Sequence, residues 1–308
     1  RTIRNQNPTG SYRRKMNIVK QDLNKILEKK VLSTEIKWMN IYHPFIARKA
    51  LPGQFIILRP TEESERIPLT IAGTNPEKGT IEIIFQEIGV TTKKLGSLDQ
   101  GEKIHNLAGP LGKPIHIENC GRVLFVTGGI GSAFVYWMAK GFKEAGNSIW
   151  AIMGARNAEL LILEDKMREI CDKVLISTDD GSKGVKGFVT NVLEDALNSG
   201  EKADLVVCAG PVLMMKNVSI ITKKYNIKTI ASLNPIMIDG TGMCGGCRVT
   251  VGGKVRFACV DGPDFDAHDV DFDELLKRTG FYKKHEQCCL DLYLKSRQQD
   301  GFTSTTAE

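Results

Sequence analysis

Three cysteines and one aspartate in a glycine-rich stretch have the clearest chemical meaning in this sequence. Asp239 is followed by Cys244, Cys247 and Cys259 with the spacing D-x4-C-x2-C-x11-C. Thiolates and carboxylates are metal ligands, and glycines let a tight loop turn several backbone N–H groups toward bound sulfur atoms. The pattern therefore predicts an inorganic centre held by Asp239, Cys244, Cys247 and Cys259.

The nature of this centre has three interpretations. Plant-type [2Fe–2S] ferredoxins use C-x4-C-x2-C with a distant fourth cysteine, and the spacing here matches with aspartate in the first position. Zinc also accepts thiolates and carboxylates, although structural zinc sites more often pair two separated C-x2-C motifs. Uncoordinated thiols are the third interpretation. The x4–x2 spacing favours the iron–sulfur cluster.

The chain must also supply elements that position these ligands. Residues 30–118 contain short apolar runs such as Phe55–Leu58 and Ile81–Phe85, separated by turn residues, which is typical of a small antiparallel sheet or barrel. Residues 119–228 alternate apolar strands with longer helical stretches, which indicates a doubly wound α/β domain on a parallel sheet. Residues 229–275 form a loop-rich segment that needs a bound centre for stability.

The predicted architecture is therefore multidomain. An antiparallel β-barrel, an α/β doubly wound nucleotide-binding domain and a loop-rich segment follow one another, between an N-terminal extension at 1–29 and a C-terminal tail at 276–308. The α/β domain is expected to contain strands at 123–127, 148–153, 174–178 and 205–209 and helices near 132–145, 159–171 and 189–199.

Composition excludes some classes of function. The 42 basic and 36 acidic residues give a net charge of +6 spread along the chain, too mild for a nucleic-acid footprint. No apolar stretch approaches the ~20 residues of a membrane helix. The first fifteen residues are basic and polar, unlike a secretory signal. Clustered thiols in a large chain suggest a reducing compartment, so we expect a cytoplasmic protein that contacts neither nucleic acid nor membrane.

The sequence around the cysteines resembles one family. The stretch Ser232–Met237 leading into Asp239–Cys247, and then Phe257–Pro263, is similar to the small, FAD-carrying subunit of NADH-dependent reduced ferredoxin:NADP oxidoreductase, also described as the sulfide dehydrogenase small subunit, in the ferredoxin–NADP reductase superfamily. The resemblance covers about Ala47 to Glu274. In that family an aspartate and three cysteines hold a [2Fe–2S] cluster. The related electron-transfer subunit of dihydroorotate dehydrogenase has four cysteines, so Asp239 separates the two.

The resemblance implies that residues 30–118 bind FAD. A cation, an apolar pair and a hydroxyl in one short stretch suit a pyrophosphate, an isoalloxazine ring and a ring nitrogen. Threonines after a glycine suit the diphosphate, although they could equally cap a helix, and the first stretch could be an ordinary edge strand. The expected FAD contacts are Arg66, Pro68, Leu69, Thr70, Gly89, Thr91 and Thr92.

The same reasoning assigns residues 119–228 to NAD(H). A glycine loop runs directly from a strand into a helix, as a dinucleotide diphosphate requires, although its glycine spacing is not G-x-G-x-x-G and a simple βα turn would look similar. Two aspartates near the expected 2′-phosphate position favour NAD over NADP, and Cys208 is either a nicotinamide contact or a buried strand residue. The expected contacts are Gly128, Gly129, Ile130, Gly131, Arg156, Thr178, Asp179, Asp180, Cys208, Gly210 and Pro211.

The expected function follows from the chemistry of these three groups. NADH delivers a hydride and a [2Fe–2S] cluster accepts one electron, so FAD is the adaptor between them, and no side chain has to act as a catalytic acid or base. The resemblance further implies a larger flavin and [4Fe–4S] partner subunit, coupling to ferredoxin through the complex, and a bifurcating or reverse reaction. The alternatives are a dihydroorotate dehydrogenase electron-transfer subunit, an iron–sulfur redox sensor and a zinc-stabilised structural protein.

Overall fold

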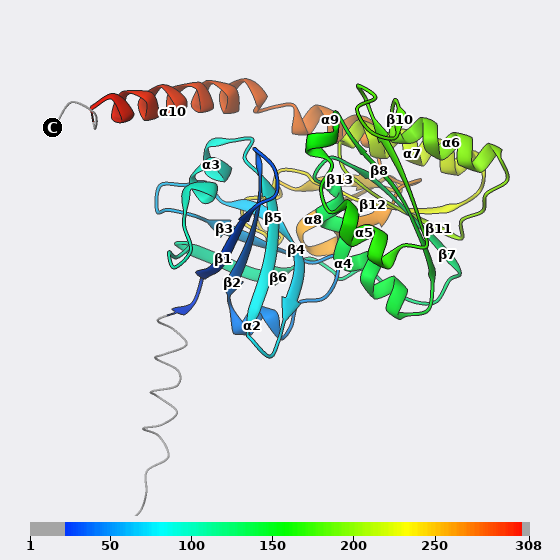
Figure 1. Cartoon of the computed structure of the whole chain (residues 1–308), viewed down its shortest axis with the longest axis horizontal. Helices are drawn as coiled ribbons and strands as arrows, with labels where there is room; N and C mark the ends of the chain where they lie inside the picture. Colours follow the sequence, from blue (N-terminus) through cyan, green and yellow to red (C-terminus); the bar gives the residue numbers. More distant parts are fainter. Residues whose placement is uncertain (1–21, 304–308) are drawn as a thin grey trace, which may run out of the picture.

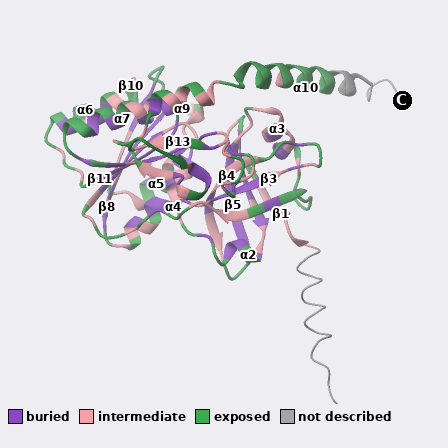
Figure 2. Ribbon diagram, turned by 180° about the vertical axis from the view of Figure 1, so that it is seen from behind, coloured by how far each residue is buried: buried purple, intermediate pink, exposed green. Residues whose placement is uncertain are grey.

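The computed structural model describes residues 22–303, with side chains to residue 298 (Figure 1). The described residues form three sheets: a six-stranded sheet in the first third, a seven-stranded sheet in the middle and a two-stranded hairpin near Cys247. Figure 2 shows that buried residues concentrate in the strands of the two larger sheets, whereas the last helix is exposed along most of its length. The separate antiparallel and mainly parallel sheets agree with the predicted multidomain fold class.

The first sheet is antiparallel and has the order β1-β2-β5-β4-β3-β6. Alternating Ile, Met and Phe side chains on its inner face, including Met39, Ile56 and Phe85, form one core. The segment before β6 returns to β1, where Ile26 N donates to Glu102 O over 2.8 Å, so the sheet closes. Its elements are β1 (Lys25–Val31), β2 (Ile36–Tyr42), α2 (Pro44–Ala47), β3 (Phe55–Arg59), β4 (Ile67–Asn75), β5 (Thr80–Gln86), α3 (Val90–Ser97) and β6 (Asn106–Leu111).

The barrel begins earlier than the sequence pattern indicates. Strand β1 starts at Lys25, inside the segment 1–29 that was expected to be an extension. Its sequence, KILEKKV, is rich in charged residues, so the strand depends on its ladder with β2 more than on its own hydrophobicity. Residues 1–21 of the expected extension lie outside the described part of the chain.

The second sheet has the order β10-β9-β8-β7-β11-β12-β15 and is parallel except for its last strand. Helix α4 lies on one face, and α6 and α7 lie on the other, which is the doubly wound arrangement. Its elements are β7 (Arg122–Gly128), α4 (Gly131–Glu144), β8 (Ser148–Ala155), η1 (Ala158–Leu160), α5 (Glu164–Ile170), β9 (Lys173–Thr178), β10 (Val185–Lys186), α6 (Val189–Asn198), β11 (Leu205–Ala209), α7 (Val212–Lys224) and β12 (Lys228–Ser232).

One predicted helix is wrong in extent. The stretch 159–171 was expected to be a single helix, but it contains a 3-10 turn, η1, and then α5 from Glu164 to Ile170. Leu163 between them has φ 59°, a left-handed conformation that a right-handed helix cannot pass through. The acidic pair Glu164 and Asp165 then favours a new helix start.

The cysteine segment is an excursion between two neighbouring strands of the second sheet. The chain leaves β12 at Ser232, forms the hairpin β13 (Arg248–Val251) and β14 (Lys254–Phe257) and the short helix α8 (Ala258–Asp261), and returns as β15 (Asp264–Asp266) beside β12. The predicted boundary at 228/229 therefore falls at a strand that belongs to the nucleotide-binding sheet.

Two helices end the described chain. Helix α9 (Phe272–Thr279) packs on α7 and β13, and α10 (Lys283–Thr303) extends past α3 of the barrel (Figures 1 and 2). The C-terminal tail expected at 276–308 is thus helical over most of its described part, to Thr303. Within residues 22–303, no helix has the length and hydropathy of a membrane span.

Candidate redox site

The three cysteines of the expected cluster lie together. Cys259 N donates to Cys247 Sγ over 3.4 Å, and both side chains are buried, whereas Cys244 is exposed. Burial first, and then the neighbouring Cys247 thiol, raise the pKa of Cys259 to about 12. Crowded thiols that resist ionisation on their own are stabilised as thiolates by a bound cation, which displaces their protons.

Asp239 belongs to the same loop. Its Oδ2 accepts hydrogen bonds from the Thr241 hydroxyl, from Thr241 N at 3.0 Å and from Met243 N at 3.4 Å. These bonds, led by the Thr241 hydroxyl, lower the pKa of Asp239, and Arg66 adds a smaller attraction. Asp239 is thus an ionised carboxylate whose own loop holds its orientation.

The loop has the backbone that an inorganic cluster needs. Gly240, Gly242 and Gly245 have φ values of 83°, 85° and 66°, which only glycine adopts at low cost. The donors Asp239, Cys244, Cys247 and Cys259 suit a [2Fe–2S] centre, which divides its ligands between two metal atoms.

The cysteine segment packs directly on the barrel. Phe55 and Ile57 of β3 share a buried apolar cluster with Met237, Cys247 and Cys259. A Cβ atom on Gly240 would lie 2.7 Å from Ile57 Cδ1 and 2.8 Å from Leu111 Cδ1, so a glycine is needed there for the loop to approach the barrel. The barrel face next to β3 therefore adjoins the expected cluster.

Two of the expected flavin residues, Pro68 and Thr70, lie on that face, whereas Leu69 packs against the barrel core. Pro68, Leu69 and Thr70 are in β4, opposite Ile57, Ile56 and Phe55 of β3. All three remain half-buried although β4 is an inner strand between β5 and β3, so part of its surface is uncovered. Arg66 is exposed just before β4 and contributes to the field at Asp239. An uncovered central strand suits a planar ring, and Arg66 suits an anion.

The second expected flavin element is the start of α3. Gly89 N donates to Thr92 Oγ1 over 3.0 Å, and the same hydroxyl donates to Gly89 O over 3.0 Å. Thr91 is buried, and a Cβ on Gly89 would meet no atom within 4 Å. The structure therefore places Thr92 in a helix cap, with open space beside Gly89 where an anion can meet the N–H groups of the helix start.

The expected dinucleotide loop is closely packed at the carboxyl edge of the sheet. A Cβ on Gly131 would lie 2.1 Å from Ala209 O, and one on Gly210 would lie 3.0 Å from Gly128 N. Gly129, with φ 54°, donates its N–H to Gly154 O over 2.7 Å. The glycines thus let the loop after β7 lie against Gly210 and Pro211 after β11, with the N-terminus of α4 open toward the same edge.

Ile130 and α4 also connect the two domains. Ile130 packs against a buried apolar cluster that joins the barrel to α4. The cluster contains Ile36, Trp38, Ala72 and Ile84 of the barrel and Ala133 of α4. Helix α4 contacts β4, the strand of the expected flavin residues. This packing brings the expected flavin and nicotinamide sites to one junction.

The loops after β8 and β9 lie side by side, because these two strands are parallel neighbours in the sheet. Asp179 N donates to Ala155 O over 3.1 Å, and Asp180 N donates to Arg156 O over 3.2 Å. Arg156, Asp179 and Asp180 are exposed, whereas Thr178 is buried and exchanges hydrogen bonds with Lys183. Bonds from the Ser182 hydroxyl and N–H lower the pKa of Asp180. Arg156 and the two aspartates therefore present one cation and two anions at this edge.

Cys208 lies away from solvent. Its side chain is 0% exposed, in the core between the sheet and α6 and α7, and burial raises the pKa of its thiol to about 12. A nicotinamide contact through this thiol stays a prediction, as do the roles of the other expected contacts.

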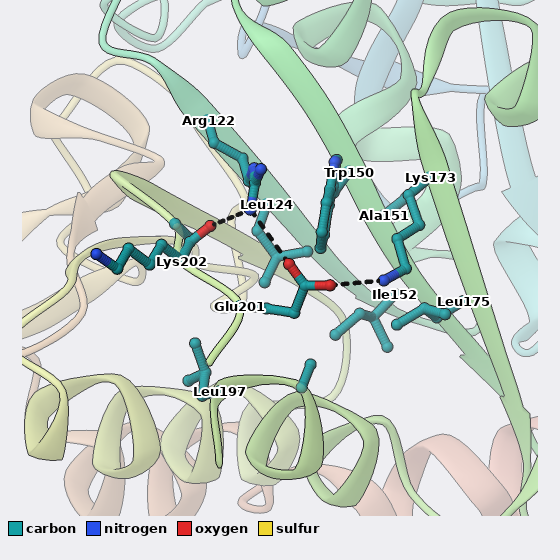
Figure 3. Close-up of a pocket in the computed structure, with 12 residues that line it drawn as sticks. Arg122, Leu124, Trp150, Ala151, Ile152, Lys173, Leu175, Leu197, Glu201 and Lys202 are labelled. Atoms are coloured by element: carbon teal, nitrogen blue, oxygen red, sulfur yellow. Dashed lines mark hydrogen bonds and ion pairs between the residues drawn. The ribbon is translucent and has the colours of Figure 1, made fainter. Parts of the chain in front are cut away.

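A second cluster of charged side chains lies at the opposite, amino end of the sheet (Figure 3). Arg122 and Lys173 stack on either side of Trp150, 4.1 Å and 4.4 Å from its ring centre, and Glu201 pairs with both cations at 3.3 Å and 2.9 Å. The cavity between them holds only about 10 Å³, roughly one water molecule. We therefore assign this cluster to stability.

Two features of the site had no signal in the sequence. Arg66 and Asp239 come from different segments, and only the packing of the cysteine loop on the barrel brings their charges together. Asp264 is a carboxylate buried at the junction of three segments, and nothing in its sequence context distinguishes it from the neighbouring Asp261 and Asp266.

Comparison with known proteins decides the family. Residues 234–271 match the iron–sulfur cluster binding domain of dihydroorotate dehydrogenase B. A Thermotoga maritima protein named dihydroorotate dehydrogenase B (NAD(+)) electron transfer subunit homolog is 45% identical over 274 residues, which is 89% of this chain and 96% of that protein. A probable electron transfer subunit from Methanocaldococcus jannaschii is 35% identical over 76% of this chain and 84% of its own length.

This chain belongs to the family of dihydroorotate dehydrogenase B electron transfer subunits and their homologues. A solved structure of NADH-dependent reduced ferredoxin–NADP oxidoreductase, from work on flavin-based electron bifurcation, is also similar, with a TM-score of 0.83 and 44% identity over 88% of this chain and 98% of that one. Phthalate dioxygenase reductase shares the fold at 16% identity and a TM-score of 0.55, over 74% of this chain and 85% of that one.

Family membership confirms the predicted class, a flavin-type oxidoreductase subunit for electron transfer within a larger complex. It also confirms that the cysteine segment is an iron–sulfur domain, whose matched residues 234–271 lie within the predicted 229–275. The predicted resemblance is confirmed at the level of this family of subunits.

Proposed function

We propose that this chain is the small subunit of an NADH-dependent ferredoxin:NADP oxidoreductase. When bound, NAD(H) would supply electron pairs as hydride, FAD would convert pairs to single electrons, and a [2Fe–2S] cluster would carry single electrons onward. The observation that carries this choice is Asp239, an ionised carboxylate in the loop that holds Cys247 and Cys259, where the four-cysteine subunits have a thiol.

The residues of this chain would bind and orient the three groups. Asp239, Cys244, Cys247 and Cys259 would hold the cluster, β4 and the start of α3 would hold FAD, and the loop at Gly128–Gly131 would hold the NAD(H) diphosphate. Asp179 and Asp180 would repel a 2′-phosphate, which favours NAD(H) over NADP(H). No side chain is required as a catalytic acid or base.

The surface around the cluster loop supports a partner subunit. Met243 is 87% exposed and Ile238 is 54% exposed, beside the exposed Cys244. Large apolar side chains around a redox centre are suited to a partner that covers them and receives electrons. We propose a larger flavin and [4Fe–4S] subunit, with ferredoxin reached through the complex and a bifurcating reaction, in the cytoplasm.

The alternative is the electron-transfer subunit of a dihydroorotate dehydrogenase, which the names of several relatives favour. The two functions differ in the partner. Anaerobic affinity purification from the native source should recover a flavin and [4Fe–4S] protein that reduces NADP⁺, and recovery of a partner that oxidises dihydroorotate would establish the alternative.

The electron path itself is tested on the isolated chain. An anaerobic visible spectrum should show a flavin band that bleaches on adding NADH, and analysis should find about two irons and two sulfides per chain. Zinc in place of iron, without flavin, would return the cysteine segment to a structural role. Iron and flavin that do not respond to NADH would favour a redox sensor.

A further inference from the structure

Asp264 lies where three segments of the chain meet. It is the first residue of β15 and pairs with Ser232, the last residue of β12. From the barrel side, the loop at Pro52 and Gly53 reaches the same point, and so does the linker at Ile115 that joins the barrel to the second sheet. The barrel loop, the linker and the end of the cysteine segment therefore converge at Asp264.

Short backbone contacts fix this junction. Ile115 N donates to Pro52 O over 3.0 Å, and Lys113 N donates to Gly262 O over 2.7 Å. A Cβ on Gly53 would lie 2.8 Å from both Asp264 Oδ2 and Ile115 N. The barrel loop can approach this closely only as glycine, and it does so directly against the carboxyl group.

The carboxyl group itself has no hydrogen-bond partner among the described residues. Both its oxygens are shielded from solvent, although the residue as a whole is only half-buried. Burying a charged carboxylate without partners is unfavourable, so burial raises the pKa of Asp264 to about 7, and the nearby Ser232 hydroxyl offsets part of the rise.

Charged groups surround the junction at the surface. A cavity of about 270 Å³ beside Asp264 is lined by Lys113 and His116 of the linker, Lys228 of β12, and Asp261 and Asp266 on either side of the strand start. These cations and anions face water, and the largest influence on Asp264 is its burial. Asp264 itself lines this cavity, although its two carboxyl oxygens are shielded from solvent, and on the inner side its charge helps to raise the pKa of the buried Cys208 thiol of β11.

We propose that Asp264 is a positioning residue that ties the barrel, the linker and the cysteine segment together with its carboxyl group protonated. A neutral carboxyl group fits the unpartnered pocket against Gly53, whereas a carboxylate draws water or a cation into the junction and loosens it. Because the barrel carries the proposed flavin site and the cysteine segment carries the proposed cluster, this junction sets their separation. The effect on the separation of flavin and cluster rests on the proposed function, whereas the effect of Asp264 on the packing of the junction does not.

The sign of the pH effect follows from linkage. The folded chain holds the Asp264 proton up to about pH 7, whereas the unfolded chain releases it near 3.8, the ordinary pKa of an aspartate. Between these values the folded state binds more protons, so stability falls as pH rises from about 4 to about 7 and then levels off. A group with a lowered pKa gives the opposite slope.

The test compares Asp264→Asn with the parent chain. Asparagine is neutral at every pH, so the Tm loss between about pH 5 and pH 8.5 should be smaller by about 5–10 °C in this variant. Protection factors for hydrogen exchange, from which the base-catalysed intrinsic rate is divided out, should fall with pH at Gly53, Lys113, Ile115 and His116 in the parent and stay flat in the variant. Asp266→Asn is the matched control, because Asp266 is an exposed carboxylate in the same strand, and it should behave like the parent.

Ser232→Ala provides a second measurement that does not depend on how Asp264→Asn folds. The Ser232 hydroxyl lowers the pKa of Asp264, so its loss should move the pH at which half of the exchange protection is lost upward. A serine with a purely structural role would not shift this midpoint. On the loaded protein, the ratio of NADH-driven cluster reduction at pH 6 and pH 8.5 should be closer to one in Asp264→Asn than in the parent.

Each outcome has one meaning. A parent-like pH profile of Tm and exchange in Asp264→Asn overturns the inference, whether or not NADH reduces the chain. A flat stability profile with an unchanged electron-transfer ratio overturns the positioning role. A chain without flavin or cluster that still shows the Asp264-dependent profile rejects the proposed function and keeps the protonated junction.

Discussion

Cys247 and Cys259 are in contact, the N–H of Cys259 pointing at the sulfur of Cys247 over 3.4 Å, although the hairpin β13–β14 separates them in the chain. Both are buried against Phe55 and Ile57 of the barrel. The hairpin therefore serves to return Cys259 to Cys247, and the contact with the barrel fixes both on the side of the proposed flavin site.

Replacing either buried cysteine should remove the cluster. We expect Cys247→Ser and Cys259→Ser to lose most of their iron and sulfide, because a serine hydroxyl does not replace a thiolate that must stabilise iron in a buried loop. Iron and sulfide analysis after anaerobic purification measures this. Cys288→Ser, in the exposed part of α10, is the control and should keep its iron. Full iron content in Cys259→Ser would exclude it as a ligand.

Asp239→Cys tests the oxygen ligand. The variant should keep a cluster but change its reduction potential, because a thiolate is a softer donor than a carboxylate. Potentiometric titration followed by visible or electron paramagnetic resonance spectra gives the comparison. Thr241→Val, which removes one hydrogen bond to Asp239 and keeps the carboxylate, should shift the potential less. An unchanged potential in Asp239→Cys would remove Asp239 from the ligand set.

Charge at the end of β9 should control the choice of nucleotide. In Asp180→Asn one negative charge is removed while an amide oxygen remains to accept from Ser182, so the KM for NADPH should fall by about tenfold relative to that for NADH. Steady-state reduction of a dye acceptor measures both constants. Asp195→Asn, an exposed change on α6, should alter neither. A parent chain that already prefers NADPH would contradict the assignment.

The glycine loop after β7 should tolerate no side chain at Gly131. Gly131→Ala places a methyl group 2.1 Å from Ala209 O, so stability should drop by about 1–3 kcal/mol and NADH binding should weaken. Gly73→Ala in β4 is the comparison, since its Cβ would meet only the Glu82 side chain at 3.6 Å. Urea denaturation and NADH titration provide both readouts, and equal stability of the two variants would show that the loop shifts freely.

Local sequence was sufficient for the parts of the fold that depend on local patterns. The strand at 205–209 is observed as predicted, because uninterrupted apolar residues flanked by polar ones specify a buried parallel strand. The spacing of Asp239 and the three cysteines identified the iron–sulfur domain for the same reason, since these residues lie within one short segment.

The features that were missed depend on long-range packing. Charged β1 is a strand because β2 and the segment before β6 pair with it, and Leu163 interrupts a helical pattern through its backbone conformation. Asp264 looks like a surface residue in the sequence, and it is buried only because the barrel loop and the linker cover it. No periodicity within one segment reports such contacts.

The return of the chain through β15 has a consequence for how this protein can be altered. Ser232 and Asp264 pair across one ladder, so the two ends of the cysteine segment are only about 5 Å apart, the spacing of adjacent strands. An insert with such close ends can be exchanged for a short turn without stretching the rest of the sheet. The sheet therefore tolerates a change in the length of this segment, whereas the buried contacts of Cys247 and Cys259 with Phe55 and Ile57 tie the segment itself to this barrel.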